Sequence, residues 1–130
     1  MAGEEDLDTL LVLLQPSLLP GDFVFCTAPN LKYGDFAELQ PVASYQEEEG
    51  LTLVLAKQSA DIAGLAYDSV FNCITLMVHS SLEAVGLTAA VSGKLAANGI
   101  SANVIAAYHH DHVFVPKNKA QLALQLLTEL

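Results

Sequence analysis

Apolar residues recur along the chain at two different periods, and each period predicts a different kind of element. Leucines between Asp6 and Gln15 follow the three- and four-residue spacing of one helical face, and Pro16 ends that pattern, which predicts a short amphipathic helix. The helical spacing returns at 59–63, 87–95 and 122–130. Apolar runs bounded by turn-forming residues predict strands at 22–28, 42–46, 51–56, 72–78, 103–108 and 112–115.

The order of these elements predicts the fold class. The first half reads helix, strand, strand, strand, helix, and the second half reads strand, helix, strand, strand, helix. This alternation is typical of ferredoxin-like α+β units, in which an antiparallel sheet carries its helices on one face. Neither half holds every element of a complete four-stranded unit, so we expect the halves to lend each other strands or to share a sheet.

Composition places the chain among folded proteins. Hydrophobic residues make up 52% and charged residues 15% of the 130 residues, which argues against disorder. The mean hydropathy of +0.41 is high, but charges, Gly and Pro interrupt every apolar run before the ~20 residues that a spanning helix needs. We therefore expect no membrane segment, and the apolar surplus predicts a homodimer interface.

The charge balance narrows the range of partners. The net charge is −10, with five Lys and no Arg, so the cation clusters that hold phosphate backbones are missing and nucleic-acid binding is not expected. A cationic or zwitterionic ligand suits this chain better than an anionic one. The acidic first residues lack the basic start of a secretory signal, so a cytoplasmic location is expected. Cys26 and Cys73 lie in apolar runs and are expected to be buried, reduced thiols.

The segment 79–87, here called the Gly86 loop, follows one predicted strand and precedes a predicted helix. Gly86 allows a ligand to approach the backbone closely, and the start of a helix favours a carboxylate. Ser80 and Glu83 have the spacing of a capping box, which is an alternative or additional role for this serine.

Four histidines raise the possibility of a metal site. His109, His110 and His112 follow one another closely, but neighbouring positions in a strand point to opposite faces, and His79 is the one outside residue placed to join them. A polar hairpin tip or a ligand contact is the preferred interpretation, and no metal or other cofactor is predicted. A serine nucleophile with a histidine base is also conceivable here, but no nucleophile elbow or phosphate loop accompanies it, so the chain is not expected to be an enzyme.

The run 81–116 resembles an ACT domain, the regulatory fold that binds amino acids in metabolic enzymes. The matching parts are Gly86-Leu87, the Gly99-Ile100-Ser101 link and the Asp111-His112-x-x-Val115 ending. The likeness is to tandem ACT proteins of bacteria and to the ACT modules of the cytosolic arginine sensor of animals. It implies two ferredoxin-like βαββαβ modules in tandem, a divergent first module over residues 1–65 and an ACT domain over 66–130.

The resemblance also implies a site and a function. A small molecule, with an amino acid as the expected class, would lie at the Gly86 loop between modules or protomers, and its binding would regulate the protein. The resemblance implies that Asp111 pairs with a cationic ligand side chain and that Tyr108 packs against this side chain. His110 occupies a position where the family has an aromatic contact residue. The implied ligand-binding residues are Ser80, Ser81, Val85, Gly86, Leu87, Ala107, Tyr108, His110 and Asp111. The alternatives are a ligand-free dimerisation or interaction module and a metal-binding protein built on the histidines.

Overall fold

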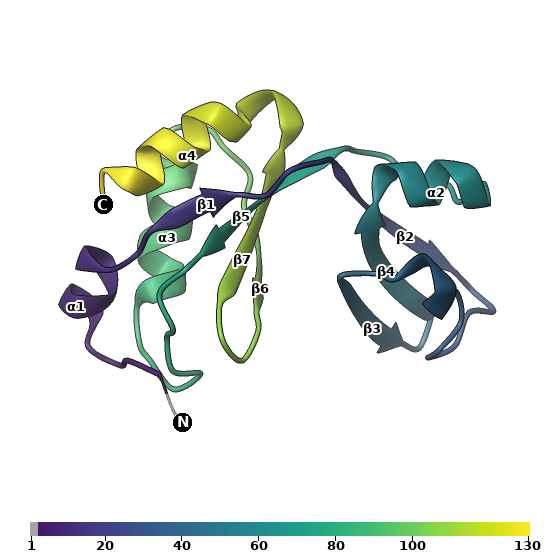
Figure 1. The fold of residues 1–130 in the computed structure, drawn as a ribbon, viewed down its shortest axis with the longest axis horizontal. Helices are drawn as coiled ribbons and strands as arrows, with labels where there is room; N and C mark the ends of the chain where they lie inside the picture. The colour runs from purple at the N-terminus through teal and green to yellow at the C-terminus, as the bar shows by residue number, and fades with distance from the viewer. Residues whose placement is uncertain (1–2) are drawn as a thin grey trace. The chain divides into compact units, whose positions relative to one another are not determined.

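The computed structural model describes residues 3–130, which form two compact units (Figure 1). The larger unit combines the N-terminal segment up to Pro20 with Asn72–Leu130, and the smaller unit is Gly21–Phe71. The smaller unit is therefore an insertion in the larger one. The first 20 residues thus pack with the C-terminal part of the chain, and the modules 1–65 and 66–130 stay a prediction.

The larger unit contains a four-stranded antiparallel arrangement. Its elements are α1 (Leu7–Val12), β1 (Pro16–Leu18), β5 (Phe71–Leu76), α3 (Leu87–Ala96), β6 (Asn103–Ala106), β7 (Asp111–Pro116), the 3-10 turn η2 (Lys117–Lys119) and α4 (Ala120–Thr128). The strand order is β1-β5-β7-β6, with Ser17 opposite Thr75 and Val104 opposite Val113. The N-terminal β1 thus supplies the strand that the second half lacks, as the expected lending of strands requires.

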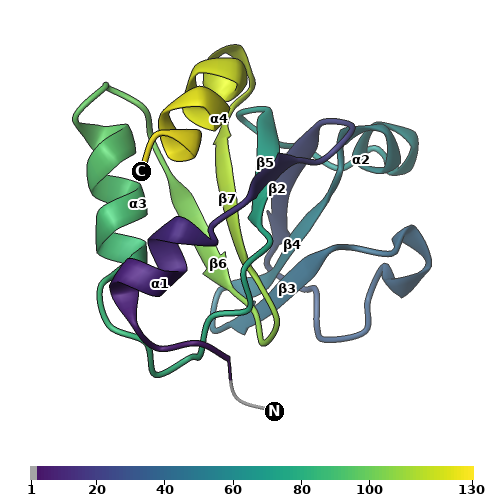
Figure 2. The same cartoon turned by 60° about the vertical axis from the view of Figure 1, so that its left-hand side comes forward.

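Helices cover one face of this arrangement, and they lie together on that side of the strands in both Figure 1 and Figure 2. Leu87, Val91 and Leu95 of α3 and Ala123 and Leu127 of α4 are buried against it, because the helical period places these residues on one stripe. The strands contribute Ile74, Leu76, Val113 and Val115 to the same core, and the N-terminal segment contributes Leu10 and Leu14. The core therefore fixes the start of α3, where the Gly86 loop ends.

The smaller unit has the same strand order but lacks one helix. Its elements are β2 (Phe23–Ala28), the 3-10 turn η1 (Ala37–Leu39), β3 (Ala43–Glu47), β4 (Gly50–Ala56) and α2 (Lys57–Ala63). The strands follow the order β3-β4-β2, and Phe71 pairs with Phe23 on the other side of β2. The position of the first helix is taken by the loop between β2 and β3. Leu31, Phe36 and Leu39 of that loop pack on the core instead.

Several local expectations are confirmed. The acidic run at 47–49 forms the turn between β3 and β4, where Glu47 pairs with Gly50. Cys26 and Cys73 are both buried free thiols, and burial raises the pKa of Cys73 to about 11. Among residues 3–130, no helix has both the length and the apolar content needed to cross a bilayer.

Candidate functional site

The Gly86 loop ends in a backbone conformation that favours glycine. Gly86 has a φ of 102° and a ψ of −15°, in the left-handed region, and it forms the N-cap of α3. No side chain caps this helix, so its first N–H groups are not satisfied by a side-chain acceptor. Leu87 is buried and anchors the helix start in the core, whereas Val85 is 82% exposed. The loop therefore presents a rigid, uncapped helix start beside an exposed apolar side chain.

The predicted capping box at Ser80 and Glu83 is wrong. The helix begins only at Leu87, and the N–H of Glu83 donates to Oγ of Ser81 at 3.1 Å within a turn. The Ser80 hydroxyl donates instead to Oδ2 of Asp111, at 3.2 Å. Ser80 and Glu83 have the residue types and the spacing of a capping box, but the chain forms a turn at 81–84 and becomes helical only at Leu87.

The bond between Ser80 and Asp111 joins two segments that lie 31 positions apart in the sequence. Ser80 is 6% exposed and Asp111 is 7% exposed. Asp111 is the first residue of β7 and pairs with Ala106 of β6, so the bond ties the Gly86 loop to the β6–β7 hairpin. The structure thus brings together the two segments from which the candidate ligand residues come. The buried carboxylate of Asp111 has to be uncovered before it can pair with a ligand side chain.

Three rings lie side by side where the loop meets the hairpin, and we call His79, Tyr108 and His109 the ring cluster. The centroids are 5.4 Å apart for His79 and His109, 6.0 Å for His79 and Tyr108, and 5.1 Å for Tyr108 and His109. Tyr108 is 54% exposed. The hairpin turn that carries the cluster is closed by the N–H of Ala107, which donates to the carbonyl of His110 at 3.1 Å.

His110 and His112 of the hairpin have different surroundings. Nδ1 of His112 lies 2.9 Å from Oγ1 of Thr75 on β5, and burial, followed by the charge of His110, lowers the pKa of His112. Nδ1 of His110 is buried without a hydrogen-bond partner. Within the part of the chain that the structure describes, no three His, Cys, Asp or Glu side chains are arranged to hold a metal ion.

Residues near the N-terminus complete this region, and sequence reasoning missed them. The N–H of Glu4 donates to the carbonyl of His79 at 2.8 Å, and the N–H of Ser81 donates to the carbonyl of Glu4 at 2.8 Å. Glu4 and Ser80 form a parallel bridge. The side chain of Leu7 lies against Gly86, since a Cβ there would be 3.1 Å from Cδ2 of Leu7. A single short pairing between distant segments leaves no periodic signal in the sequence.

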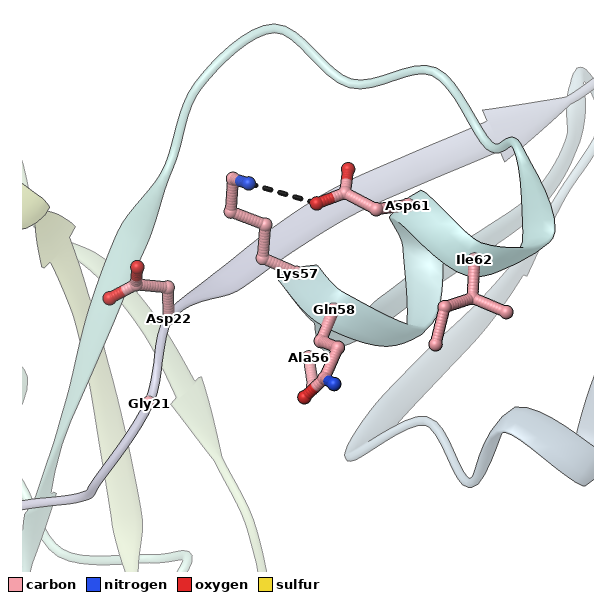
Figure 3. A pocket seen from close by; sticks show the side chains of 7 residues that line it. All are labelled: Gly21, Asp22, Ala56, Lys57, Gln58, Asp61 and Ile62. Carbon is pink, nitrogen blue, oxygen red and sulfur yellow. Dashed lines mark hydrogen bonds and ion pairs between the residues drawn. The ribbon is translucent and has the colours of Figure 1, made fainter.

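A hollow of about 390 Å³ lies on the smaller unit at the start of α2 (Figure 3). The carboxylate of Asp61 accepts from Nζ of Lys57 at 2.8 Å and from the hydroxyl of Tyr67 at 2.6 Å. These bonds, that of Lys57 first, lower the pKa of Asp61, and the bond to Asp61 raises the pKa of Lys57. The charges of Lys57 and Asp61 therefore already satisfy each other, and Asp22 adds another acidic group to the lining.

The fold is shared with regulatory proteins of known structure. A protein of unknown function from Vibrio cholerae, described as a possible transport protein, is 55% identical over 94% of this chain and 95% of its own, with a TM-score of 0.82. Protein Atu0741 from Agrobacterium tumefaciens is 17% identical, with a TM-score of 0.72 over 88% and 86% of the two chains. The ligand-free regulatory subunit of aspartate kinase from Thermus thermophilus is 10% identical, with a TM-score of 0.63 over 90% and 97%.

Family models cover almost the whole chain. An ACT-domain model matches residues 2–72, and a second ACT-domain model matches residues 68–129. Among curated proteins, none matches the chain. The two matches follow the order of the sequence, whereas β1, which lies in the first matched region, pairs with β5 in the larger compact unit. The chain therefore belongs to the ACT-domain family and carries two ACT domains in tandem.

Proposed function

We propose that this protein is a regulatory sensor that binds an amino acid at the Gly86 loop. The observation that carries the proposal is the left-handed Gly86 at the uncapped start of α3. An uncapped helix start attracts a carboxylate, because its free N–H groups and the helix dipole both favour negative charge. The ten-residue α3 is held firmly by its buried residues Leu87, Val91 and Leu95, so the N–H groups are preorganised.

The surroundings of the loop favour a zwitterion over a simple anion. The chain has a net charge of −10, and the loop itself carries Glu83, which is exposed. Acidic groups near the loop attract an ammonium group and disfavour a second negative charge on the ligand. Tyr108 and His109 of the ring cluster are exposed and offer a polarisable surface to a ligand side chain. An α-amino acid combines the carboxylate, the ammonium group and the side chain that this region can recognise.

A sensing role fits this site better than catalysis does. The Ser80 hydroxyl, which would be the natural nucleophile, donates to the carboxylate of Asp111 and not to a histidine. Because the same bond joins the loop to the β6–β7 hairpin, a ligand at the loop acts on both segments together. We propose that the ligand selects one arrangement of loop and hairpin, and that a cytoplasmic homodimer transmits this shift in population.

A thermal-shift titration tests this proposal. A ligand that binds only the folded protein raises Tm by mass action, so at least one of the twenty proteinogenic L-amino acids should raise Tm in a dose-dependent manner. Gly86→Ala should abolish the rise, because its Cβ enters the loop beside Leu7. The matched control is Gly99→Ala at the other end of α3, where φ is also positive, at 71°, and a Cβ meets nothing within 4 Å. The control should retain the ligand response.

A second candidate function is a ligand-free interaction module. The observation that favours it is the contact of Glu4 and Leu7 with the Gly86 loop, since these residues occupy space that a ligand would need. This candidate predicts no change in Tm with any amino acid at millimolar concentration. It also predicts that Gly86→Ala and Gly99→Ala respond alike.

A further inference from the structure

Residues 3–5, which we call the N-terminal strap, lie along the backbone of the Gly86 loop. Two hydrogen bonds of 2.8 Å hold the strap: Glu4 donates to the carbonyl of His79, and Ser81 donates to the carbonyl of Glu4. Both loop partners, a carbonyl and an N–H group, are backbone groups of the segment to which the proposed function assigns the ligand. A ligand that uses the carbonyl of His79 or the N–H of Ser81 therefore competes with the strap for these two groups.

The strap fits the loop so closely that no ligand atom can enter between them. A Cβ on Gly3 would lie 2.4 Å from the carbonyl oxygen of His79 and 2.6 Å from the carbonyl carbon of Ser80, distances that real side chains do not reach. Beyond the strap, the side chain of Leu7 lies over Gly86. The strap thus covers the first end of the loop, at residues 79–81, while Leu7, which belongs to α1, lies at the other end.

The charges of the strap oppose the ligand that the site would take. Glu4 and Glu5 are both exposed, and they add two carboxylates to the strap. The Glu4 carboxylate folds back to accept from the N–H groups of Glu5 and Asp6, at 3.0 and 3.1 Å. A ligand carboxylate therefore meets like charge while the strap is in place, and this repulsion disappears when the strap leaves.

The strap can leave while the rest of the N-terminal segment stays bound. Asp6 caps α1 by accepting from the N–H and the hydroxyl of Thr9, at 3.0 and 2.8 Å, so the helix begins independently of the strap. Leu10 and Leu14 behind it are fully or almost fully buried and anchor the segment in the core. The strap itself buries no large apolar side chain, which places it among the segments that open most easily.

We propose that the N-terminal strap is a displaceable cover of the Gly86 loop, which keeps the loop closed until an amino acid replaces it. This inference rests on the proposed function and adds its regulation. Because a ligand binds only those molecules in which the strap is open, the apparent affinity is the intrinsic affinity multiplied by the open fraction. Each of its two backbone hydrogen bonds accounts for a factor of about five, so the strap weakens ligand binding roughly 25-fold.

Two variants release the strap in different ways, and a third variant serves as the control. Gly3→Ala pushes the strap away from the loop, because its Cβ collides with backbone atoms of residues 79–81. Deletion of residues 1–5 removes the two hydrogen bonds altogether. Gly93→Ala also adds one methyl group to a glycine, but on α3, where it meets nothing within 4 Å. Hydrogen exchange at the N–H of Ser81 should be slow in the parent and in the control, and fast in the two release variants.

The binding readout is the midpoint of a thermal-shift titration with an equimolar mixture of the twenty proteinogenic L-amino acids. The proposal expects a midpoint roughly 25-fold lower in both release variants and an unchanged midpoint in Gly93→Ala. A deletion variant with the parent's midpoint, or with a higher one, would overturn the inference alone, since the strap would then be neutral or part of the site. If no variant responds to the mixture at any concentration, both the inference and the proposed function are contradicted.

Discussion

The buried bond between Ser80 and Asp111 makes the most quantitative prediction about the candidate site. Replacing Ser80 with Ala removes the hydroxyl that donates to a carboxylate exposed by only 7%. A hydrogen bond to a charged group contributes about 1.5–3 kcal/mol, and a buried acceptor left without it keeps its desolvation penalty. We therefore expect Ser80→Ala to lower the free energy of unfolding by about 2 kcal/mol.

The neighbouring serine provides the matched control. Ser81 accepts from the N–H of Glu83 in an exposed turn, so Ser81→Ala should change stability by no more than ~0.5 kcal/mol. Urea denaturation gives the free energies. In a thermal melt, the loss expected for Ser80→Ala corresponds to about 6–12 °C in a chain of this size.

A double-mutant cycle separates the bond from other effects of each substitution. Once Asp111→Ala has removed the acceptor, the further change Ser80→Ala should cost far less than it does alone. The reasoning is refuted if Ser80→Ala costs no more than Ser81→Ala, or if the two substitutions at 80 and 111 are additive. Either result would mean that the loop and the hairpin are not tied by this bond.

Three further properties should follow from the structure. Gly50→Ala should destabilise the protein by more than ~2 kcal/mol in urea denaturation, because φ is 147° and the new Cβ would be placed 2.2 Å from the carbonyl oxygen of Ala28. Gly64→Ala, which meets open space at a φ of 71°, should cost about 1 kcal/mol, and equal losses would contradict the argument. With its pKa raised to about 11 by burial, Cys73 should react with iodoacetamide at neutral pH only as the protein unfolds, and rapid labelling of the native thiol would oppose this. Burial lowers the pKa of His112, so the unfolded state binds its proton more readily. Stability should therefore be full above about pH 6.5, the ordinary pKa of histidine, and decrease as the pH falls below it, and His112→Gln should flatten this part of the pH profile.

Local sequence patterns predict much of this fold. The leucines before Pro16 form α1, the apolar runs form β2, β4, β5 and β7, and the last residues form α4. These elements are predictable because periodicity and turn residues act over a few positions. The tight turn at 47–50 follows from the same local rules.

The remaining features depend on contacts between distant segments. β1 is a strand of only three residues that begins at a proline, and it is stabilised by pairing with β5 rather than by its own composition. The loop after β2 replaces a helix because Leu31, Phe36 and Leu39 can cover the core without one. Tertiary pairing overrides local propensity at β1, whereas the loop after β2 agrees with the absence of helical spacing at 29–41.

The candidate site shows the same division. The Gly86 turn was predictable, since a left-handed residue before a helix calls for glycine. The placement of Asp111 beside Ser80, and of Glu4 on the backbone of the loop, was not, because each is a single contact between segments that carry no shared pattern. The capping-box spacing was misleading for a related reason, since the Ser80 hydroxyl bonds to the distant Asp111 and not to the start of a helix.

The central claim is that an amino acid binds at the Gly86 loop, and amide chemical shifts of the isotope-labelled protein test it most directly. During titration with an equimolar mixture of the proteinogenic L-amino acids, the account predicts that the largest changes occur at Ser81, Gly86 and Leu87, with accompanying changes at the hairpin residue Tyr108. Titration that leaves these amides unmoved, or that moves those around Lys57 and Asp61 instead, would contradict it.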